Sequence, residues 1–174
     1  MPLYLQKDNG IRGLTDCLPA GATGPGSEWG LIYELDEPSI LTSMEALLYC
    51  GYGLGGNVKV RANVYSVTSI SPALGLSLIG SSAELYFYSP WSRIQAQLPI
   101  SPSLNVSGTI LISIENRLGI WFDFPPCQQY DTHADIPESM SWIKAFDTGE
   151  WTEHYNYFDE PGIYGYPMIR GYGP

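Results

Sequence analysis

From about residue 38 onward, apolar and polar residues alternate in short runs along the chain. The clearest run covers residues 57–67, where β-branched and small apolar residues occupy every second position. Such a period of two is typical of a strand with one buried and one solvated face. The predicted buried face holds Val58, Val60, Ala62 and Val64, and the opposite face holds Lys59, Arg61 and Asn63.

Further strand-like runs follow at intervals of about 8–12 residues, a spacing typical of all-β sandwiches and barrels. They cover residues 76–79, 83–88, 93–98, 109–114, 118–124, 140–144 and 164–170. Segments rich in Ser, Pro and Gly separate them, as expected for turns. No alternation of strands with helices is visible, so we predict an all-β fold, a jelly-roll-like antiparallel β-sandwich.

One segment, Ile40 to Cys50, has an ambiguous pattern. Leu41, Met44, Leu47 and Leu48 lie at helical spacing. The same residues also fit a strand with alternate positions turned inward. We favour the strand because the neighbouring segments are strands, and a short helix stays the alternative.

Residues 1–37 differ from the rest, because a Gly/Pro-rich loop over Leu18–Ser27 separates two short apolar pieces. We predict an N-terminal arm in residues 1–37 and a β-sandwich domain in residues 38–174. An extended arm can add a strand to the exposed sheet edge of a neighbour. The candidate residues for such an inter-subunit contact are Leu3, Tyr4, Leu5 and Trp29.

The chain has 174 residues, 8 basic and 18 acidic side chains, a net charge of −10 and a pI near 4.4. This length fits one domain. The acidity argues against binding to nucleic acid, which needs a basic surface, and against an anionic membrane surface. No apolar run approaches the roughly 18 residues of a membrane span, and no signal peptide is visible.

Catalytic motifs are sparse. The sequence has two histidines, His133 and His154, and no Gly-x-Ser-x-Gly motif. Its three cysteines show no zinc-type spacing, and we favour buried thiols, with one disulfide and one free thiol as the alternative. We therefore expect a protein without enzymatic activity.

Acidic residues gather between positions 123 and 160, where nine carboxylates have Lys144 as their one basic companion. Oxygen-rich loops of this kind suit calcium. We nevertheless favour a solvated acidic rim without a cofactor, and calcium is the alternative. The candidate calcium ligands are Asp131, Asp135, Asp147 and Glu150.

The last third of the chain is also rich in aromatic residues. Trp and Tyr beside carboxylates and amides can stack on sugar rings or form protein–protein contacts. We expect most of these rings to pack in the core, as we also expect for Trp91 and Trp121, and contact with a ligand or partner is the alternative. The candidates for contact with a glycan or a protein partner are Trp142, Trp151, Tyr155 and Tyr157.

The order of several motifs is similar to that of a known group of domains. These motifs are residues 58–67, Tyr88–Ile94, Leu98–Thr109, Ile110–Ile114 and Gly165–Arg170. Together they resemble the jelly-roll β-sandwich accessory modules found beside larger domains in secreted and cell-surface bacterial proteins. The resemblance implies a non-catalytic module that binds or packs against a partner.

A jelly roll with an arm and no visible signal peptide also suits a virion protein, because jelly rolls recur in capsid and lectin domains. We therefore expect a structural subunit that assembles with copies of itself and with a capsid, tail or filament neighbour. The candidates are a phage decoration or tail accessory protein and an extracellular filament subunit. The alternative is a carbohydrate-binding module whose partner is a surface glycan. Both place the protein on a virion or outside the cell.

Overall fold

The computed structural model describes residues 2–8, 12–16, 24–50, 56–89, 93–118, 126–131, 140–153 and 167–174. All regular structure in these residues is β-strand, and every strand pairing is antiparallel. The prediction of an all-β fold is therefore confirmed. The jelly-roll topology stays a prediction. None of the residues described here forms a helix that could cross a membrane.

The described residues form eleven strands joined in one sheet. They are β1 (Tyr4–Leu5), β2 (Arg12–Asp16), β3 (Glu28–Cys50), β4 (Gly56–Ser69), β5 (Gly75–Ser81), β6 (Leu85–Ser89), β7 (Arg93–Asn116), β8 (Pro126–Asp131), β9 (Ser141–Lys144), β10 (Trp151–Glu153) and β11 (Ile169–Tyr172). The main path through the sheet is β1-β11-β3-β7-β4-β5. Strands β2, β6, β8, β9 and β10 attach to it at the sides.

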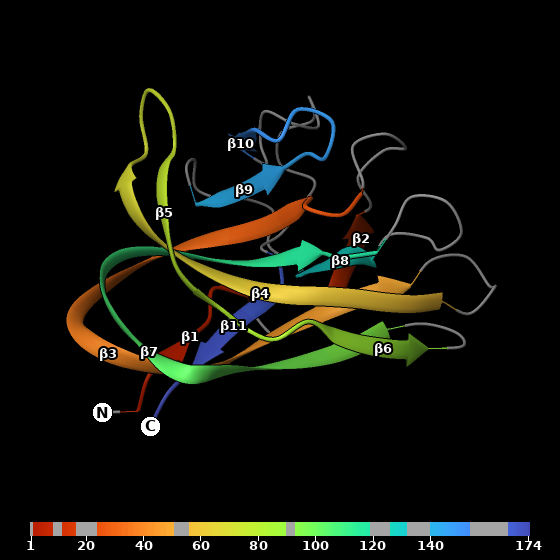
Figure 1. The fold of residues 1–174 in the computed structure, drawn as a ribbon, viewed down its shortest axis with the longest axis horizontal. Coiled ribbons are helices and arrows are strands. Elements are labelled where there is room, and N and C mark those ends of the chain that lie inside the picture. Colours follow the sequence, from red (N-terminus) through yellow and green to blue (C-terminus); the bar gives the residue numbers. More distant parts are fainter. Residues whose placement is uncertain are drawn as a thin grey trace.

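The sheet folds over on itself because its two longest strands bend together. Figure 1 shows β3 and β7 curving round the same end of the molecule, so that each contributes to two layers. Register shifts lie at this corner, between Leu35 and Ser39 and between Leu41 and Ser43 of β3. Opposite the corner, Gly108 has a φ of +63°, a conformation that glycine adopts without steric cost. Bulges and such glycines sharpen the bend of a strand without ending its pairing.

The corner accounts for two differences from the sequence-based prediction. Residues 93–98 and 109–114, predicted as separate strands, both belong to β7. Strand β3 runs through the boundary placed between residues 37 and 38, so residues 28–37 are part of the sheet. Residues 40–50 continue the same strand, which confirms the strand interpretation of this segment.

The main core lies between the two layers. Residues from both halves of β3 and β7 meet there, with the predicted apolar face of β4. The register shifts of β3 change which positions face inward, from odd numbers before the corner to even numbers after it. Fully buried examples are Leu31, Met44, Leu48, Val60, Val64, Leu98, Ile112 and Ile114.

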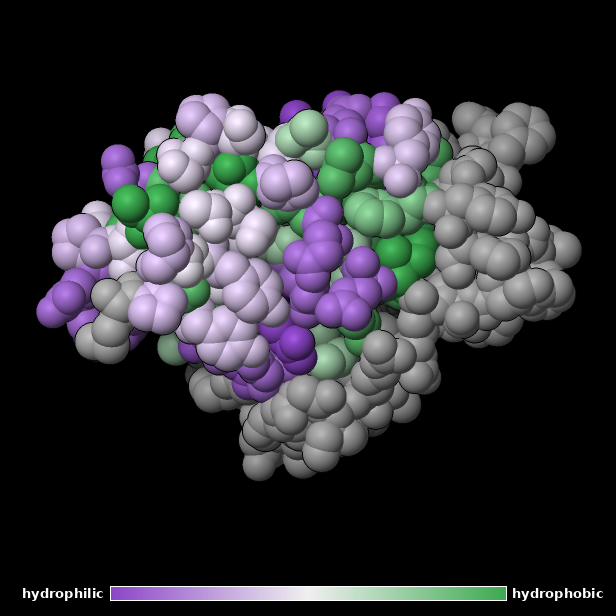
Figure 2. All heavy atoms as spheres, turned by 90° about the horizontal axis from the view of Figure 1, so that it is seen from below, coloured by the Kyte–Doolittle hydropathy of each residue, from purple (hydrophilic) through white to green (hydrophobic). Residues whose placement is uncertain are grey.

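The two ends of the described chain lie beside each other, at the lower left of Figure 1. Strand β1 pairs with β11, with Tyr4 opposite Tyr172 and Leu5 opposite Gly171. Figure 2, which shows the molecule from below, has mostly polar residues on the left of the face, whereas apolar residues gather on the right beside the grey atoms.

Candidate functional site

The site of interest lies on the outer face of the layer formed by the first half of β3, the second half of β7, and β4, β5, β9 and β10. We call this surface the outer face, since it points away from the main core. Its side chains form cross-strand rows, because residues directly opposite in antiparallel strands point to the same side. One row is apolar and contains Ile32, Leu111, Tyr65 and Leu78.

A second row brings two carboxylates side by side. Glu28 of β3 lies directly opposite Glu115 of β7, and the two are flanked by Lys144 of β9 and Arg61 of β4. Like charges placed opposite each other destabilise a sheet, especially when buried. Glu28 is only 1% exposed and Glu115 only 4%. This pair must therefore be compensated by its neighbours.

Glu28 obtains its compensation from four side chains. The Ser113 hydroxyl donates to Oε2 at 2.6 Å, and the Tyr65 hydroxyl lies 3.0 Å from both carboxylate oxygens. The Asn63 amide donates to Oε2 at 3.2 Å, and Lys144 Nζ donates to Oε1 at 3.1 Å. Burial, followed by the charge of Glu28, raises the pKa of Tyr65 well above its ordinary value. Tyr65 therefore stays protonated and acts as a donor.

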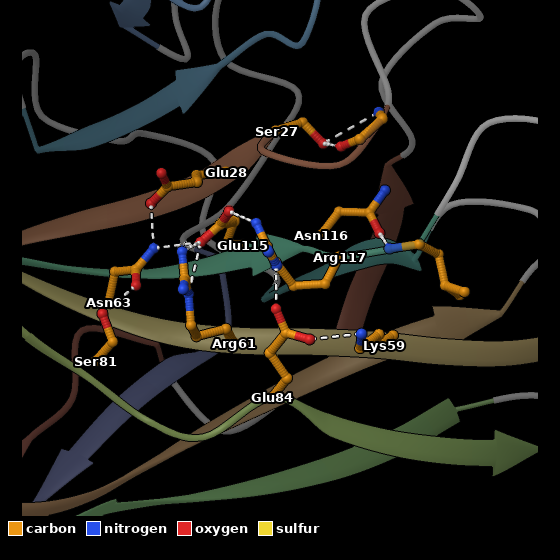
Figure 3. Close-up of polar contacts among 12 residues, drawn as sticks. Ser27, Glu28, Lys59, Arg61, Asn63, Ser81, Glu84, Glu115, Asn116 and Arg117 are labelled. Carbon is orange, nitrogen blue, oxygen red and sulfur yellow. Dashed lines mark hydrogen bonds and ion pairs between the residues drawn. The ribbon is translucent and has the colours of Figure 1, made fainter.

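Glu115 is held by two guanidinium groups and the same amide. Arg61 Nη2 lies 2.6 Å from Oε2, and Arg117 Nη1 lies 2.7 Å from Oε1. Asn63 Nδ2 donates to Oε2 at 2.8 Å and so bridges the two carboxylates (Figure 3). Burial acts to raise the pKa of Glu115, but the hydrogen bonds from Asn63, Arg61 and Arg117 outweigh it and lower the pKa.

The polar row continues to the surface through Glu84. Arg117 Nε donates to Glu84 at 2.7 Å, and Lys59 Nζ lies 2.5 Å from the other oxygen (Figure 3). Charges alternate in sign along this chain of ion pairs, so each carboxylate has a cationic partner. Since the buried carboxylates are occupied by these partners, we interpret the network as structural.

A pocket of about 700 Å³ opens over the apolar end of the outer face. One wall is the loop of residues 70–74, which joins β4 to β5. The other wall is formed by residues 149–153, which include β10. Figure 1 shows this loop and the strands β9 and β10 on the same side of the molecule. The sheet thus brings segments about 80 residues apart in sequence to face each other.

Two tryptophans define the pocket. Trp151 lies opposite Lys144 in the β9–β10 pairing, and Trp142 lies opposite Glu153, so all four side chains share one face. Trp142 is 6% exposed and packs with Ile32 and Leu111, while Trp151 is half-buried. The rings of Trp151 and Tyr65 meet edge to face, with centroids 6.0 Å apart.

Gly30 makes room for this packing. It lies opposite Trp142, and a Cβ atom at this position would lie 2.8 Å from a methyl carbon of Leu111. A side chain here would displace Leu111, which packs with Trp142 beneath the pocket. The absent side chain of Gly30 therefore shapes the base of the pocket.

No protein-family model matches the chain, and no curated protein matches it. The functional argument therefore depends on the pocket and on its surroundings.

The structure brings together two of the four predicted contact residues. Trp142 and Trp151 line the same pocket, Trp142 as its buried base and Trp151 as its accessible wall. Tyr155 and Tyr157 lie outside the described residues. Trp91 and Trp121, expected in the core, also lie outside them.

The predicted arm residues pack within their own chain. Trp29 is 1% exposed in the main core, and Leu5 is buried there as well. Leu3 packs against the same core, and Tyr4 is the exposed member of the set, with its ring near Tyr172. Trp29 is therefore not available for contact with a neighbour in this structure, and β1 completes the sheet of its own chain.

The four candidate calcium ligands are not seen as one cluster. Asp147 and Glu150 are exposed on the connection between β9 and β10. Asp131 ends β8, and Asp135 lies outside the described residues. Within the described ranges, no three acidic, histidine or cysteine side chains lie close enough together to hold a metal ion.

The loop of residues 70–74 and Tyr65 are parts of the site that the sequence pattern does not single out. The loop contains Ser71-Pro72, which indicates only a turn. Tyr65 continues the alternation of β4 on the outward face, and no other local feature of the sequence indicates that it belongs to the site. Their approach to Trp151 depends on long-range pairing across the sheet.

Proposed function

We propose that this protein is a non-enzymatic binding module that takes a carbohydrate in the pocket between residues 70–74 and 149–153. The observation that carries the proposal is the meeting of Trp142 and Trp151 in one pocket with Glu150 and Glu153. An aromatic face stacks on the C–H groups of a sugar ring, and carboxylates accept hydrogen bonds from its hydroxyls. An aromatic ring for stacking, Trp151, and two acceptor carboxylates, Glu150 and Glu153, lie along one wall of the pocket.

The size and shape of the pocket support this proposal. Binding sites for small organic ligands usually enclose about 300–1,000 Å³, and this pocket has about 700 Å³. Trp142 is fixed by the apolar row beneath it, and Trp151 is supported by Tyr65. A rigid aromatic wall lowers the entropy lost on binding.

The absence of catalysis is part of the proposal. Glu28 and Glu115 are close enough to resemble a catalytic carboxylate pair, but both are buried and held by cationic and amide partners. Neither lines the pocket. A general acid or base must reach its substrate, and these two groups do not.

The test is a screen of oligosaccharides, followed by titration calorimetry on those that bind. We expect Trp151→Ala to weaken binding by about tenfold or more, the loss of about 1.4 kcal/mol or more of stacking. The matched control is Tyr86→Ala, because Tyr86 is 68% exposed on β6, outside the pocket. Circular dichroism checks that both variants fold. Equal binding by Trp151→Ala and the parent, or release of reducing ends during incubation, contradicts the proposal.

A second candidate function is an assembly subunit on a virion or an extracellular filament. One observation favours it: in the part of the chain that the structure describes, β5 pairs with β4 alone and leaves its other edge open. This edge carries no charged residue, and Leu78 is 55% exposed. Uncharged open edges favour pairing with another strand. If two molecules pair through antiparallel β5 strands centred on Leu78, the Leu78 residues of the two molecules lie opposite each other.

The native mass by light scattering, measured with and without a chelator, tests the assembly function. We expect an oligomer that Leu78→Lys converts to a monomer, since a charge on the edge opposes pairing. Ile40→Lys is the matched control, because Ile40 is similarly exposed but lies on β3. A loss of mass in the chelator would add calcium as a cofactor. A monomeric parent protein contradicts this candidate.

A further inference from the structure

The charged side chains that line the pocket all have the same sign. Among its lining side chains the two charged groups are Glu150 and Glu153, and both are acidic. Glu150 is exposed, and within the described residues its carboxylate has no hydrogen bond or ion pair. Glu153 lies opposite Trp142 in the β9–β10 pairing, so it shares the face of the tryptophans. Two carboxylates therefore lie beside the aromatic wall.

Two cations on the outer face are already paired. Lys144, which lies opposite Trp151, contacts the buried Glu28 at 3.1 Å. Arg61 Nη2 lies 2.6 Å from Glu115 Oε2. Their positive charges therefore neutralise the buried Glu28 and Glu115 and not the carboxylates that line the pocket. Together with a net charge of −10 on the chain, this leaves a negative potential at the pocket.

We propose that the pocket selects oligosaccharides that carry protonated amino groups, such as chains of glucosamine, over neutral and acidic sugars. This inference rests on the proposed carbohydrate-binding function and specifies its ligand class. The sugar ring stacks on Trp151, and its ammonium group pairs with Glu150 by charge-assisted hydrogen bonds. A cation close to the face of a tryptophan gains a further electrostatic attraction.

The same arrangement disfavours the other classes of sugar. An acidic sugar would place its carboxylate against Glu150 and Glu153 in a pocket whose described lining has no basic group. A neutral sugar can stack on Trp151 but gains no ion pair. A lysine side chain supplies the ammonium group without a ring to cover the indole, so we favour the amino sugar over a cationic peptide.

The experiment is titration calorimetry of the full chain in mildly acidic buffer of low ionic strength. Four probes are compared: a glucosamine tetramer, its fully N-acetylated counterpart, a galacturonate tetramer and trilysine. We expect the glucosamine tetramer to bind about tenfold more tightly than the acetylated one, with a strong loss of affinity in added salt. We expect no measurable binding of the galacturonate tetramer.

Two carboxylate variants locate the effect. We expect Glu150→Gln to weaken binding of the glucosamine tetramer by about fivefold to tenfold and to weaken binding of the acetylated tetramer less, because glutamine keeps an oxygen that accepts from hydroxyls but loses the ion pair. Glu150→Gln/Glu153→Gln should weaken it further. The matched control is Glu37→Gln, an exposed carboxylate on β3 that does not line the pocket.

The outcomes separate this inference from the function on which it rests. Equal, Trp151-dependent binding of the acetylated and free tetramers overturns the charge selectivity and retains the carbohydrate module. Failure of every sugar to bind in a Trp151-dependent way overturns both. Binding of trilysine as tight as that of the glucosamine tetramer, with the same dependence on Glu150, overturns the amino sugar in favour of a cationic peptide.

Discussion

Arg170 and Asp8 join the last strand of the chain to its N-terminal segment. Arg170 Nε and Nη2 donate to the two carboxylate oxygens of Asp8 at 2.9 and 2.6 Å. The side chain of Asp8 is fully buried, and Arg170 also contacts Glu45 of β3 at 3.2 Å. The hydrogen bonds to Asp8, with burial opposing them, raise the pKa of Arg170. The ion pair holds residues 2–8 against their own sheet.

The first prediction concerns this pair. Asp8→Asn removes the negative charge that pairs with Arg170, and we expect a loss of about 1.5–3 kcal/mol in the free energy of unfolding, the usual range for hydrogen bonds to a charged group. Urea unfolding measures this loss. Asp147→Asn, on an exposed side chain, is the control and should change stability little. Equal stability of Asp8→Asn and the parent would show that the N-terminal segment is not held by the pair.

The second prediction is a loss of stability in acid that depends on Glu115. The pKa of Glu115 is lowered in the folded protein, from an ordinary value of 4.5. The unfolded chain therefore takes up this proton at a higher pH than the folded one. The stability that Glu115 contributes is complete above about pH 4.5 and is lost as the pH falls through the folded-state pKa.

Glu115→Gln isolates this contribution. We expect the variant to be about 1–3 kcal/mol less stable at neutral pH, because Arg61 and Arg117 lose their common carboxylate. The difference from the parent should shrink below about pH 4.5. Urea midpoints at several pH values provide the measurement, with Glu37→Gln as an exposed control. A difference that does not change with pH would exclude the titration of Glu115 as its cause.

The third prediction concerns the base of the pocket. Gly30→Ala places a Cβ 2.8 Å from Leu111, and overpacking of this kind usually costs about 1–3 kcal/mol. Leu111→Val shortens the side chain that the new methyl group meets. We therefore expect Leu111→Val to destabilise the Gly30→Ala variant less than it destabilises the parent. A double-mutant cycle by thermal unfolding gives the coupling energy, and strictly additive effects would contradict the proposed contact.

The local pattern predicted part of the strands, such as β4, but not β2, β8 or β10 and not the connections between strands. The alternation of residues 57–67 gave the inward face of β4, because a period of two depends only on neighbouring positions. Residues 28–37 were assigned to an arm, since the Gly/Pro-rich loop before them suggested a boundary. Their place in the sheet depends on pairing of Glu28 with Glu115, which is 87 positions away.

In the candidate site as well, some residues could be predicted from the local pattern, whereas others depend on long-range pairing. Trp142 and Trp151 could be selected from the sequence because they stand in or beside a polar, aromatic-rich stretch. The loop of residues 70–74 could not, since it reaches them only when the β4–β5 hairpin and the β9–β10 hairpin face each other across the sheet. The buried ion pairs of Glu28 and Glu115 likewise depend on cross-strand register, which composition does not encode.

The last prediction separates the two roles of Tyr65, whose hydroxyl contacts Glu28 and whose ring contacts Trp151. Tyr65→Phe keeps the ring and removes the hydroxyl, so we expect about 1 kcal/mol less stability and unchanged sugar binding. Tyr65→Leu removes the ring as well, so Trp151 loses its support and binding should weaken. Urea unfolding and calorimetry on the same samples measure both effects. If Tyr65→Phe weakened binding as much as Tyr65→Leu, then Glu28 and its partners would govern the pocket, and the network could not be only structural.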